Sequence, residues 1–424
     1  MINYNRLGYE IKRDLTTFSE KISKGLTRPK SKFVTQMIYG ILAGNKVHLS
    51  EIARSLNETI RLKKTIWRLS RNLFAFEEKE TVMDNYISVV RKQIDEENAV
   101  IVIDNSDITK PCSPKMEAIT DVRDGSTGEI KKGYCTIEAA VLSKRKKMPL
   151  PVYEKVFSAA EEGFISETHE NLCCLKVLSA YFSKNCVRTL DRGFDGNTYY
   201  KYFLKKQEKF VIRAKKNRNV IYRGKTRNIM DVANEYKGNY RMDFMDKHGR
   251  RIGCKISYIP VSLCEFPAKS LILAVVYGFG KEPMLLLTNL ETKERKKLCT
   301  IVAKIYLMRW RIEEYFKFKK QQFELEDLRV MSLQSIRNMN LFATLAAGYI
   351  GIMSSEKDST VFMLELRECS KRIYNMPKFI FYALGYAIER VLAGTRSGIR
   401  GFLLKKEQSQ QLTLTQCFGI EAFG

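Results

Sequence analysis

Histidine is scarce in this sequence, and no cysteine spacing suggests a metal site. Only 3 of the 424 residues are histidine, and the 10 cysteines form neither a CxxC pair nor a Cys/His arrangement of the kind that binds zinc. We therefore expect no zinc site, and we expect the thiols to be reduced, as in a cytoplasmic protein.

Long apolar stretches are also absent. The most apolar candidate, Leu341–Met353, is shorter than the about 18 residues that a membrane-spanning helix needs. The N-terminal segment MINYNRLGYEIKRD lacks the apolar region of a signal peptide. We therefore expect cytoplasmic localisation and no membrane partner.

Acidic residues are in the minority. The chain has 73 Lys+Arg against 47 Asp+Glu, a formal net charge of +26, and no single basic tail accounts for it. Such a diffuse positive charge attracts an extended polyanion, so DNA or RNA is the expected partner and a membrane surface the weaker alternative. The length suits two or three domains, and 45% hydrophobic residues is ordinary for a folded protein.

One segment places acidic and basic groups on a common helix face. Cys299–Gln322 contains no Gly or Pro and predicts one continuous helix. At about 100° per residue, one carboxylate and four possible phosphate ligands fall within an arc of roughly 80°. They are Tyr306, Arg309, Glu313, Lys317 and Lys320. This arrangement suits a metal-binding acid flanked by phosphate contacts. On spacing alone, a solvated charged face is the commoner explanation.

Four of these residues carry a family resemblance. Tyr306, Arg309, Glu313 and Lys320 follow the pattern Y-x2-R-x3-E-x6-K within RWRIEEYFKFKK and its surroundings. In this the sequence resembles the IS-four family of bacterial insertion-sequence DDE transposases, the group with the YREK signature. The resemblance implies a ribonuclease-H-like catalytic core and two further catalytic aspartates upstream, each at the end of a buried strand.

Two upstream apolar segments do end in aspartate. AVIVID at 99–104 ends in Asp104, and NCVRTLD at 185–191 ends in Asp191, two residues before Gly193. A carboxylate at the end of a buried strand projects into the crevice where α/β sheets bind ligands, although an isolated aspartate there is more often a turn residue. The resemblance assigns Asp104, Asp191 and Glu313 to a catalytic triad that holds two Mg²⁺ or Mn²⁺ ions. Carboxylate oxygens suit such hard cations.

The predicted fold class is α/β, a ribonuclease-H-like mixed-sheet core with a β-rich insertion, flanked by helical regions. We predict a helical DNA-binding domain at 1–95, the first part of the core at 96–206, the insertion at 207–283, the last core strand with the catalytic helix at 284–330, and a helical region at 331–424. The insertion is inferred because Asp191 and Glu313 are far apart in the sequence. The last region includes a basic, glycine-broken segment at 395–406.

The N-terminal helices admit two interpretations. Segments 49–56 and 60–74 could form a helix-turn-helix whose second helix offers basic residues to DNA, or a small bundle with a solvated basic face. The basic residues are Arg61, Lys63, Lys64, Arg68 and Arg71. Trp67 is predicted to lie in the core.

The resemblance also implies a reaction and its contacts. The enzyme would bind terminal inverted repeats, cut both strands through a hairpin intermediate and join the 3′ ends to target DNA, acting as a homodimer. Tyr306, Arg309, Lys317 and Lys320 would contact phosphates, and Arg213 in KFVIRA would contact DNA nearby. Met284 stands where relatives often carry a base-holding tryptophan, so strand cleavage is better supported than hairpin formation.

Two alternatives remain at the level of sequence. The first is a catalytically inert captured transposase that acts as a DNA-binding regulator. The second is a metal-dependent nuclease of ribonuclease-H-like fold, which would cut DNA without joining it.

Overall fold

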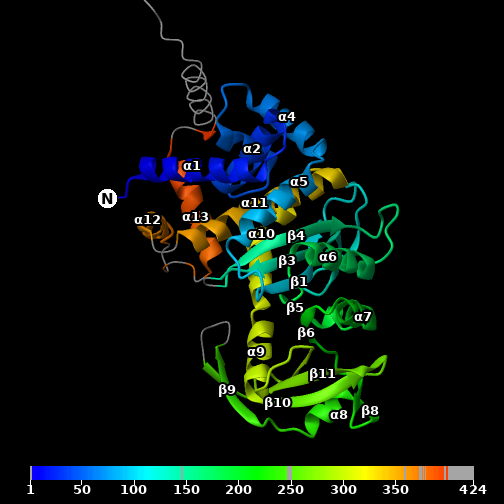
Figure 1. The fold of residues 1–424 in the computed structure, drawn as a ribbon. Coiled ribbons are helices and arrows are strands. Elements are labelled where there is room, and N and C mark those ends of the chain that lie inside the picture. The colour runs from blue at the N-terminus through cyan, green and yellow to red at the C-terminus, as the bar shows by residue number, and fades with distance from the viewer. Residues whose placement is uncertain are drawn as a thin grey trace, which may run out of the picture.

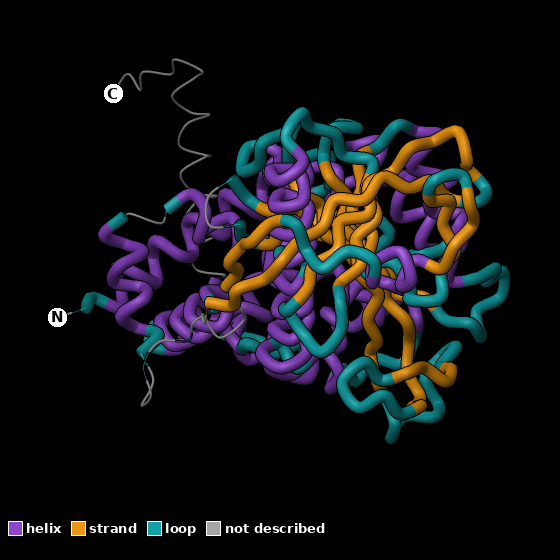
Figure 2. Tube along the Cα trace, turned by 90° about the horizontal axis from the view of Figure 1, so that it is seen from below, coloured by secondary structure: helices purple, strands orange, loops and turns teal. Residues whose placement is uncertain are grey.

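A mixed β-sheet forms the body of the molecule, with helices gathered at one end of it (Figures 1 and 2). The computed structural model describes residues 2–144, 147–245, 251–357, 360–371, 375, 377, 379–395 and 398–399. Within them, the strands form one 12-stranded sheet of order β2-β3-β1-β5-β6-β12-β11-β10-β7-β8, with β4 paired to β3 and β9 to β10.

The first part of the sheet is the ribonuclease-H-like core. Its strands are β1 (Val100–Thr109), β2 (Thr120–Arg123), β3 (Ile130–Leu142), β4 (Pro149–Phe157), β5 (Val187–Leu190) and β6 (Lys209–Arg213). Strands β1, β3 and β4 form an antiparallel meander, and β5 and β6 continue the sheet parallel to β1. The crossovers contain α6 (Glu167–Tyr181), the short helix η1 (Arg192–Phe194) and α7 (Asn197–Lys206). This order confirms the predicted fold class.

Two strands differ from their predicted positions. β1 continues to Thr109, so Asp104 lies within this strand and not at its end. The reason is that β1 has two neighbours: its pairing with β5 ends at Val102, whereas its pairing with β3 continues to Thr109. β6, which the sequence placed in the insertion, is a core strand parallel to β5.

The later strands extend the same sheet and form the lower part of Figure 1. They are β7 (Asn219–Tyr222), β8 (Lys225–Asn228), β9 (Tyr240–Met245), β10 (Arg251–Leu263), β11 (Phe266–Tyr277) and β12 (Met284–Thr288), with α8 (Ile229–Asn234) beside them. β12 pairs antiparallel with β6. The β-rich segment therefore shares a sheet with the core.

The segment predicted as one long helix is divided in two. α9 (Arg295–Leu307) packs against β6, β10, β11 and β12, whereas α10 (Trp310–Gln322) packs against β1, β4 and the C-terminal helices. Between them, Arg309 N donates to Tyr306 O at 2.9 Å and Ile312 N donates to Arg309 O at 3.0 Å. Each of these bonds joins residues three apart, and not four apart as in an α-helix. The prediction of one continuous helix was wrong because two different surfaces direct its halves.

Helices from both ends of the chain form a common layer. They are α1 (Tyr4–Ile22), α2 (Arg28–Gly44), α3 (Leu49–Leu56), α4 (Leu62–Phe74), α5 (Lys79–Arg91), α11 (Leu333–Glu356), α12 (Val361–Cys369) and α13 (Ile380–Ala393). α11 is buried along most of its length and packs on α2, α4, α5, α13 and β4 (Figure 1). Phe33 and Phe76 pack against Phe342 of α11, with ring centroids 5.4 and 5.3 Å from it. The N-terminal helices are thus joined to the core through α11.

Two sequence predictions for the helical regions need comment. Trp67, predicted to lie in the core, is 57% exposed, because the buried residues of α4 are Thr65, Leu69 and Leu73. The basic segment predicted at 395–406 falls mostly outside the described residues. None of the described helices combines the length and the apolar character that crossing a bilayer requires.

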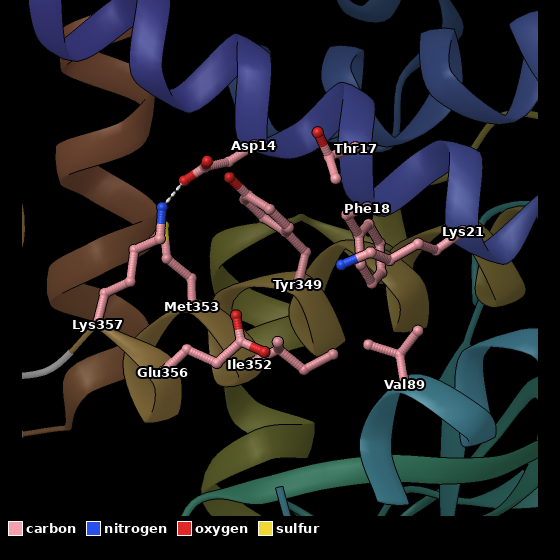
Figure 3. A pocket seen from close by; sticks show the side chains of 10 residues that line it. All are labelled: Asp14, Thr17, Phe18, Lys21, Val89, Tyr349, Ile352, Met353, Glu356 and Lys357. Carbon is pink, nitrogen blue, oxygen red and sulfur yellow. Dashed lines mark hydrogen bonds and ion pairs between the residues drawn. The ribbon is translucent and has the colours of Figure 1, made fainter. Parts of the chain in front are cut away.

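A cavity of about 100 Å³ lies between α1, α5 and α11 (Figure 3). Phe18, Tyr349 and Ile352 line it, and Lys357 forms an ion pair with Asp14 at one side. None of the site residues predicted from the sequence lines this cavity. It belongs to the helical layer.

Candidate active site

Asp104 and Asp191 lie at the place where β5 ends beside β1. The last pair of these parallel strands joins Val102 to Thr189, so continuing the register by two residues brings Asp104 level with Asp191. Asp191 keeps an extended backbone, and neighbouring strands lie about 4.8 Å apart. The fold therefore brings the two predicted aspartates to one edge.

The backbone after Asp191 is fixed by its own side chain. Gly193 N donates to Asp191 Oδ1 at 2.7 Å. A Cβ atom added at Gly193 would lie 3.0 Å from the same oxygen, closer than side chains normally approach. Glycine is therefore suited to this position, where the chain turns beside the carboxylate.

Glu313, in the first turn of α10, is joined to Asp104 through Arg309. The Arg309 guanidinium donates through Nη1 to Asp104 Oδ2 at 2.5 Å and through Nη2 to Glu313 Oε1. Arg309 and Asp104 are largely shielded from solvent, whereas the Glu313 side chain is 47% exposed. The arginine thus joins the strand acid to the helix acid.

The three acids are close enough for the charges of Asp191 and Glu313 to affect the pKa of Asp104. Burial raises the pKa of Asp104 to about 7, the Arg309 guanidinium opposes this rise, and the carboxylates of Asp191 and Glu313 add to it. Burial alone would lower the pKa of Arg309, but Asp104, Tyr306 and Glu313 outweigh it and raise that pKa. A cation is therefore strongly favoured among these carboxylates.

The donor set fits a hard divalent cation. Three carboxylates offer oxygen ligands only, which is the chemistry that Mg²⁺ and Mn²⁺ prefer. Among the described residues, only His48, Glu324 and Asp327 have three ligand atoms within 4.8 Å of one another, so the triad is more open than that distance. Its acids are held apart around the Arg309 guanidinium, and a metal ion would have to compete with this arginine.

The cluster of His48, Glu324 and Asp327 has an explanation in its own contacts. His48 Nε2 hydrogen-bonds the carbonyl oxygen of Asp327 at 2.9 Å, and Glu324 pairs with Lys46 at 2.8 Å. These bonds tie α3 to the short helix η2 (Leu325–Asp327) after α10. We therefore regard the cluster as structural.

The remaining members of the helix stripe have different environments. Tyr306 is buried on α9, with its ring 5.8 Å from the Arg309 guanidinium carbon. Lys317 is exposed on α10. Lys320 Nζ donates to Asp107 Oδ2 at 2.8 Å and lies 3.3 Å from Glu326 Oε1, so this predicted phosphate ligand is already paired with acids.

The other predicted DNA contacts are dispersed. Arg213, partly exposed, is the last residue of β6 and pairs with Leu286 of β12. Met284 is buried at the start of β12, opposite Val276, which does not favour contact with a base.

Sequence reasoning missed a buried acid in the loop that follows the second aspartate. Asp195 accepts hydrogen bonds from Tyr200 OH at 2.8 Å, Lys215 N at 2.6 Å and Arg218 Nε at 2.5 Å. These bonds tie the loop after Asp191 to the chain that leaves β6. The signal in the sequence that could have identified Asp195 is its position, four residues after Asp191.

A buried polar network lies under α10 and was also missed. Lys319 Nζ donates to both Glu138 oxygens at 2.8 and 3.0 Å, to Asn340 Oδ1 at 2.8 Å and to Thr344 Oγ1 at 3.0 Å. Tyr315 OH donates to Glu138 Oε2 at 2.9 Å. Glu138 is the residue opposite Asp104 in the β1–β3 ladder. The network therefore anchors α10 to the strand next to the one that carries Asp104.

The same network continues to the N-terminal helices. Asn340 Nδ2 donates to Glu154 Oε2 at 2.5 Å, and Lys79 Nζ of α5 donates to the backbone oxygen of Glu154 at 2.9 Å. Buried groups bonded in this way fix the relative positions of the elements that carry them. α5, β4, α11 and α10 are thus connected by one chain of polar contacts.

Comparisons with known proteins complete the description. No curated protein matches the chain. Among solved structures, one similar chain is the piggyBac transposase in a synaptic complex with hairpin DNA, with 9% identity over 95% of this chain and 82% of that one, at a TM-score of 0.47. Another is Ciona intestinalis endonuclease V with an inosine-containing DNA, with 11% identity over 58% of this chain and 99% of that one, at a TM-score of 0.26. The family described as the transposase DDE domain matches residues 167–348. That segment contains Asp191 and Glu313, and the match supports a DDE transposase.

Proposed function

We propose that this protein is a DNA transposase in which Asp104, Asp191 and Glu313 hold two divalent metal ions, Mg²⁺ or Mn²⁺, for phosphodiester cleavage. The observation that carries the proposal is that Arg309 bonds both Asp104 of β1 and Glu313 of α10, while Asp191 lies level with Asp104 at the end of β5. The spacing of Tyr306, Arg309, Glu313 and Lys320 supports placing it in the IS-four family, YREK group.

The metal ions would supply an activated water or 3′-hydroxyl and would stabilise the leaving oxygen. The chain's own residues position the ligands: β1 and β5 hold the two aspartates in register, and α10 presents Glu313 beside them. Among the described residues, Arg309 Nε is buried without a hydrogen-bond partner, so this guanidinium keeps a donor that an oxygen ligand such as a phosphate could use if the site opens.

The proposed DNA contacts follow from exposure and charge. Arg309 and the exposed Lys317 lie on the same stretch as Glu313 and would contact phosphates there. Lys320 would do so only by exchanging Asp107 and Glu326 for a phosphate. Arg213 and Met284 remain proposed contacts on the strength of the family resemblance alone.

The reaction is proposed in full as the resemblance implies it. The enzyme binds the terminal inverted repeats of its element, cleaves the ends through hairpin intermediates and joins the 3′ ends to target DNA. It acts as a homodimer on the paired ends, in the cytoplasm. The net charge of +26 supports double-stranded DNA as the partner.

The test uses purified protein, Mg²⁺ and a DNA fragment that carries the inverted repeats flanking the reading frame. Asp104→Ala, Asp191→Ala and Glu313→Ala should each abolish cleavage and leave end binding within a few-fold. Glu314→Ala is the matched control, because this neighbouring acid pairs with Arg311 and not with the triad. Full cleavage by Glu313→Ala would refute the assignment.

The same assay separates the alternatives. Strand transfer supports the transposase. Binding without cleavage by the unmodified protein would indicate a captured transposase acting as a regulator. Cleavage without joining would indicate a metal-dependent nuclease.

A further inference from the structure

Two of the cations predicted to bind phosphates near the acids are themselves paired with carboxylates. The Arg309 guanidinium bonds Asp104 and Glu313, and its side chain is 16% exposed. Lys320 Nζ lies 2.8 Å from Oδ2 of the buried Asp107. The acids and cations of this region therefore neutralise each other by direct contact. A phosphate or a metal ion can bind these groups only by replacing one of the present partners.

The Arg309 guanidinium lies where the oxygen ligands of a metal ion would have to gather, because it bonds one acid of β1 and one of α10. Oxygens that bind the same Mg²⁺ ion lie within about 4.2 Å of one another. In the part of the chain that the structure describes, no choice of oxygens brings Asp104, Asp191 and Glu313 all within 4.8 Å of one another. The three acids therefore cannot all bind one ion in this arrangement.

The ion pairs of Arg309 can be reached from solvent on the side of Glu313. The Glu313 side chain is 47% exposed, whereas that of Asp104 is largely buried. A phosphate accepts two parallel hydrogen bonds from a guanidinium, as a carboxylate does, so it can take the place of either acid. A DNA phosphate that arrives beside Glu313 can therefore become the partner of Arg309, and the exchange requires only rotation of the arginine side chain.

We propose that the ion pairs of Arg309 keep metal ions off Asp104 and Glu313 until a DNA phosphate replaces these acids at the guanidinium, so that DNA and metal ions bind cooperatively. This inference rests on the proposed function, because it describes how the same site is regulated. A metal ion that binds alone leaves a largely buried guanidinium without its carboxylates, which is costly. When a phosphate and metal ions bind together, the guanidinium and the acids all have partners of opposite charge.

The test measures Mn²⁺ binding by calorimetry, with and without a DNA duplex that ends at the last nucleotide of the element. This duplex has no flanking DNA, so the end cannot be cleaved during the measurement, and the heat of Mn²⁺ binding to the duplex alone is subtracted. The ions assigned to the three acids are those that Asp191→Ala no longer binds. In the parent, DNA should tighten their binding about 10- to 100-fold, within the usual range of coupling between two sites.

The coupling must also be reciprocal. Mn²⁺ should tighten the binding of a fluorescein-labelled form of the same duplex, followed by anisotropy at constant ionic strength, by the same factor. This second readout depends on neither cleavage nor strand transfer.

Variants of Arg309 test its part in the coupling. Arg309→Ala should bind Mn²⁺ more tightly than the parent without DNA, and DNA should then tighten that binding less than about fivefold. Arg309→Gln, which removes the charge but keeps much of the side-chain length, should behave in the same way. The matched control is Arg311→Ala, because Arg311 pairs with Glu314 at 3.3 Å and not with the acids of the site. It should keep the coupling factor of the parent. Circular dichroism verifies that each variant is folded.

Two outcomes would overturn the inference. One is equal Mn²⁺ affinity of the parent with and without DNA. The other is a coupling factor in both Arg309 variants that equals that of the parent, which would assign the coupling to other groups. The proposed function fails differently, because Asp104→Ala would then retain cleavage of the element's ends whatever the coupling factor is.

Discussion

Replacing Lys319 by methionine should destabilise the protein strongly, because it leaves a buried carboxylate without its cation. Lys319 and Glu138 have side chains that are 1% and 3% exposed, and four hydrogen bonds converge on the ammonium. Removing one partner of a buried, hydrogen-bonded ion pair costs about 3–5 kcal/mol. The free energy of unfolding should fall by about that amount.

The paired substitution separates the cost of the unpaired charge from the value of the ion pair itself. In Lys319→Met/Glu138→Leu no unpaired charge remains, and replacing a buried ion pair by apolar groups is often neutral or stabilising by about 1–4 kcal/mol. We expect the double variant to recover most of the loss, with a coupling energy of at least about 2 kcal/mol. Lys317→Met, two residues earlier and exposed, is the control and should stay within about 0.5 kcal/mol of the parent.

The network should also position Glu313, and stability alone cannot show this. Under conditions where every variant is folded, calorimetric binding of Mn²⁺ without DNA should weaken about 10- to 100-fold in Lys319→Met. Lys317→Met should bind Mn²⁺ like the parent. Urea denaturation gives the free energies. A loss below about 1 kcal/mol for Lys319→Met, or unchanged Mn²⁺ affinity, would refute the argument.

Three further predictions concern the acids and their partners. Arg309→Ala should lower the salt slope of DNA binding by about 0.9, and in calorimetry without DNA it should bind Mn²⁺ more tightly, because the guanidinium no longer competes for Asp104 and Glu313. Arg218→Met should lower the free energy of unfolding by about 1–3 kcal/mol and slow cleavage, because Asp195 loses its cation. Burial raises the pKa of Asp104 to about 7. Between about pH 4 and 7 the folded protein therefore keeps a proton on Asp104 that the unfolded chain has released. The contribution of Asp104 to the free energy of unfolding should fall as the pH rises through this window. Asp104→Asn should flatten that fall in urea denaturation at a series of pH values.

The elements that sequence predicted best are those whose burial is uniform. The apolar, β-branched stretch before Asp104 and the short one before Asp191 both became neighbouring parallel strands. In the stretch before Asp104 the residues themselves report burial on both faces, so the pattern and the fold agree, whereas β5 also buries Arg188 and Thr189.

Features set by distant residues were not predictable. The division of the helix predicted at 299–322 depends on the surfaces beneath α9 and α10, and no Gly or Pro marks it. Helical spacing and the family resemblance predicted Lys320 as a phosphate ligand on the same face as Arg309, and neither reveals that the fold also brings Asp107 and Glu326 to it. Trp67 was assigned to the core from its loose helical phase with Leu62 and Leu69, which does not reveal that α4 buries only a narrow stripe.

Because the helix divides at Arg309, residues of one sequence pattern lie on two helices that pack against different parts of the molecule. Tyr306 belongs to α9, which rests on the later strands, whereas Glu313 belongs to α10, which Lys319 anchors to β3 of the core. Arg309 stands between them, and its guanidinium is bonded on the core side to Asp104 and Glu313. The position of Glu313 is therefore set by the core strands and the C-terminal helices, while Arg309 is the residue through which a change at the later strands would reach the carboxylates.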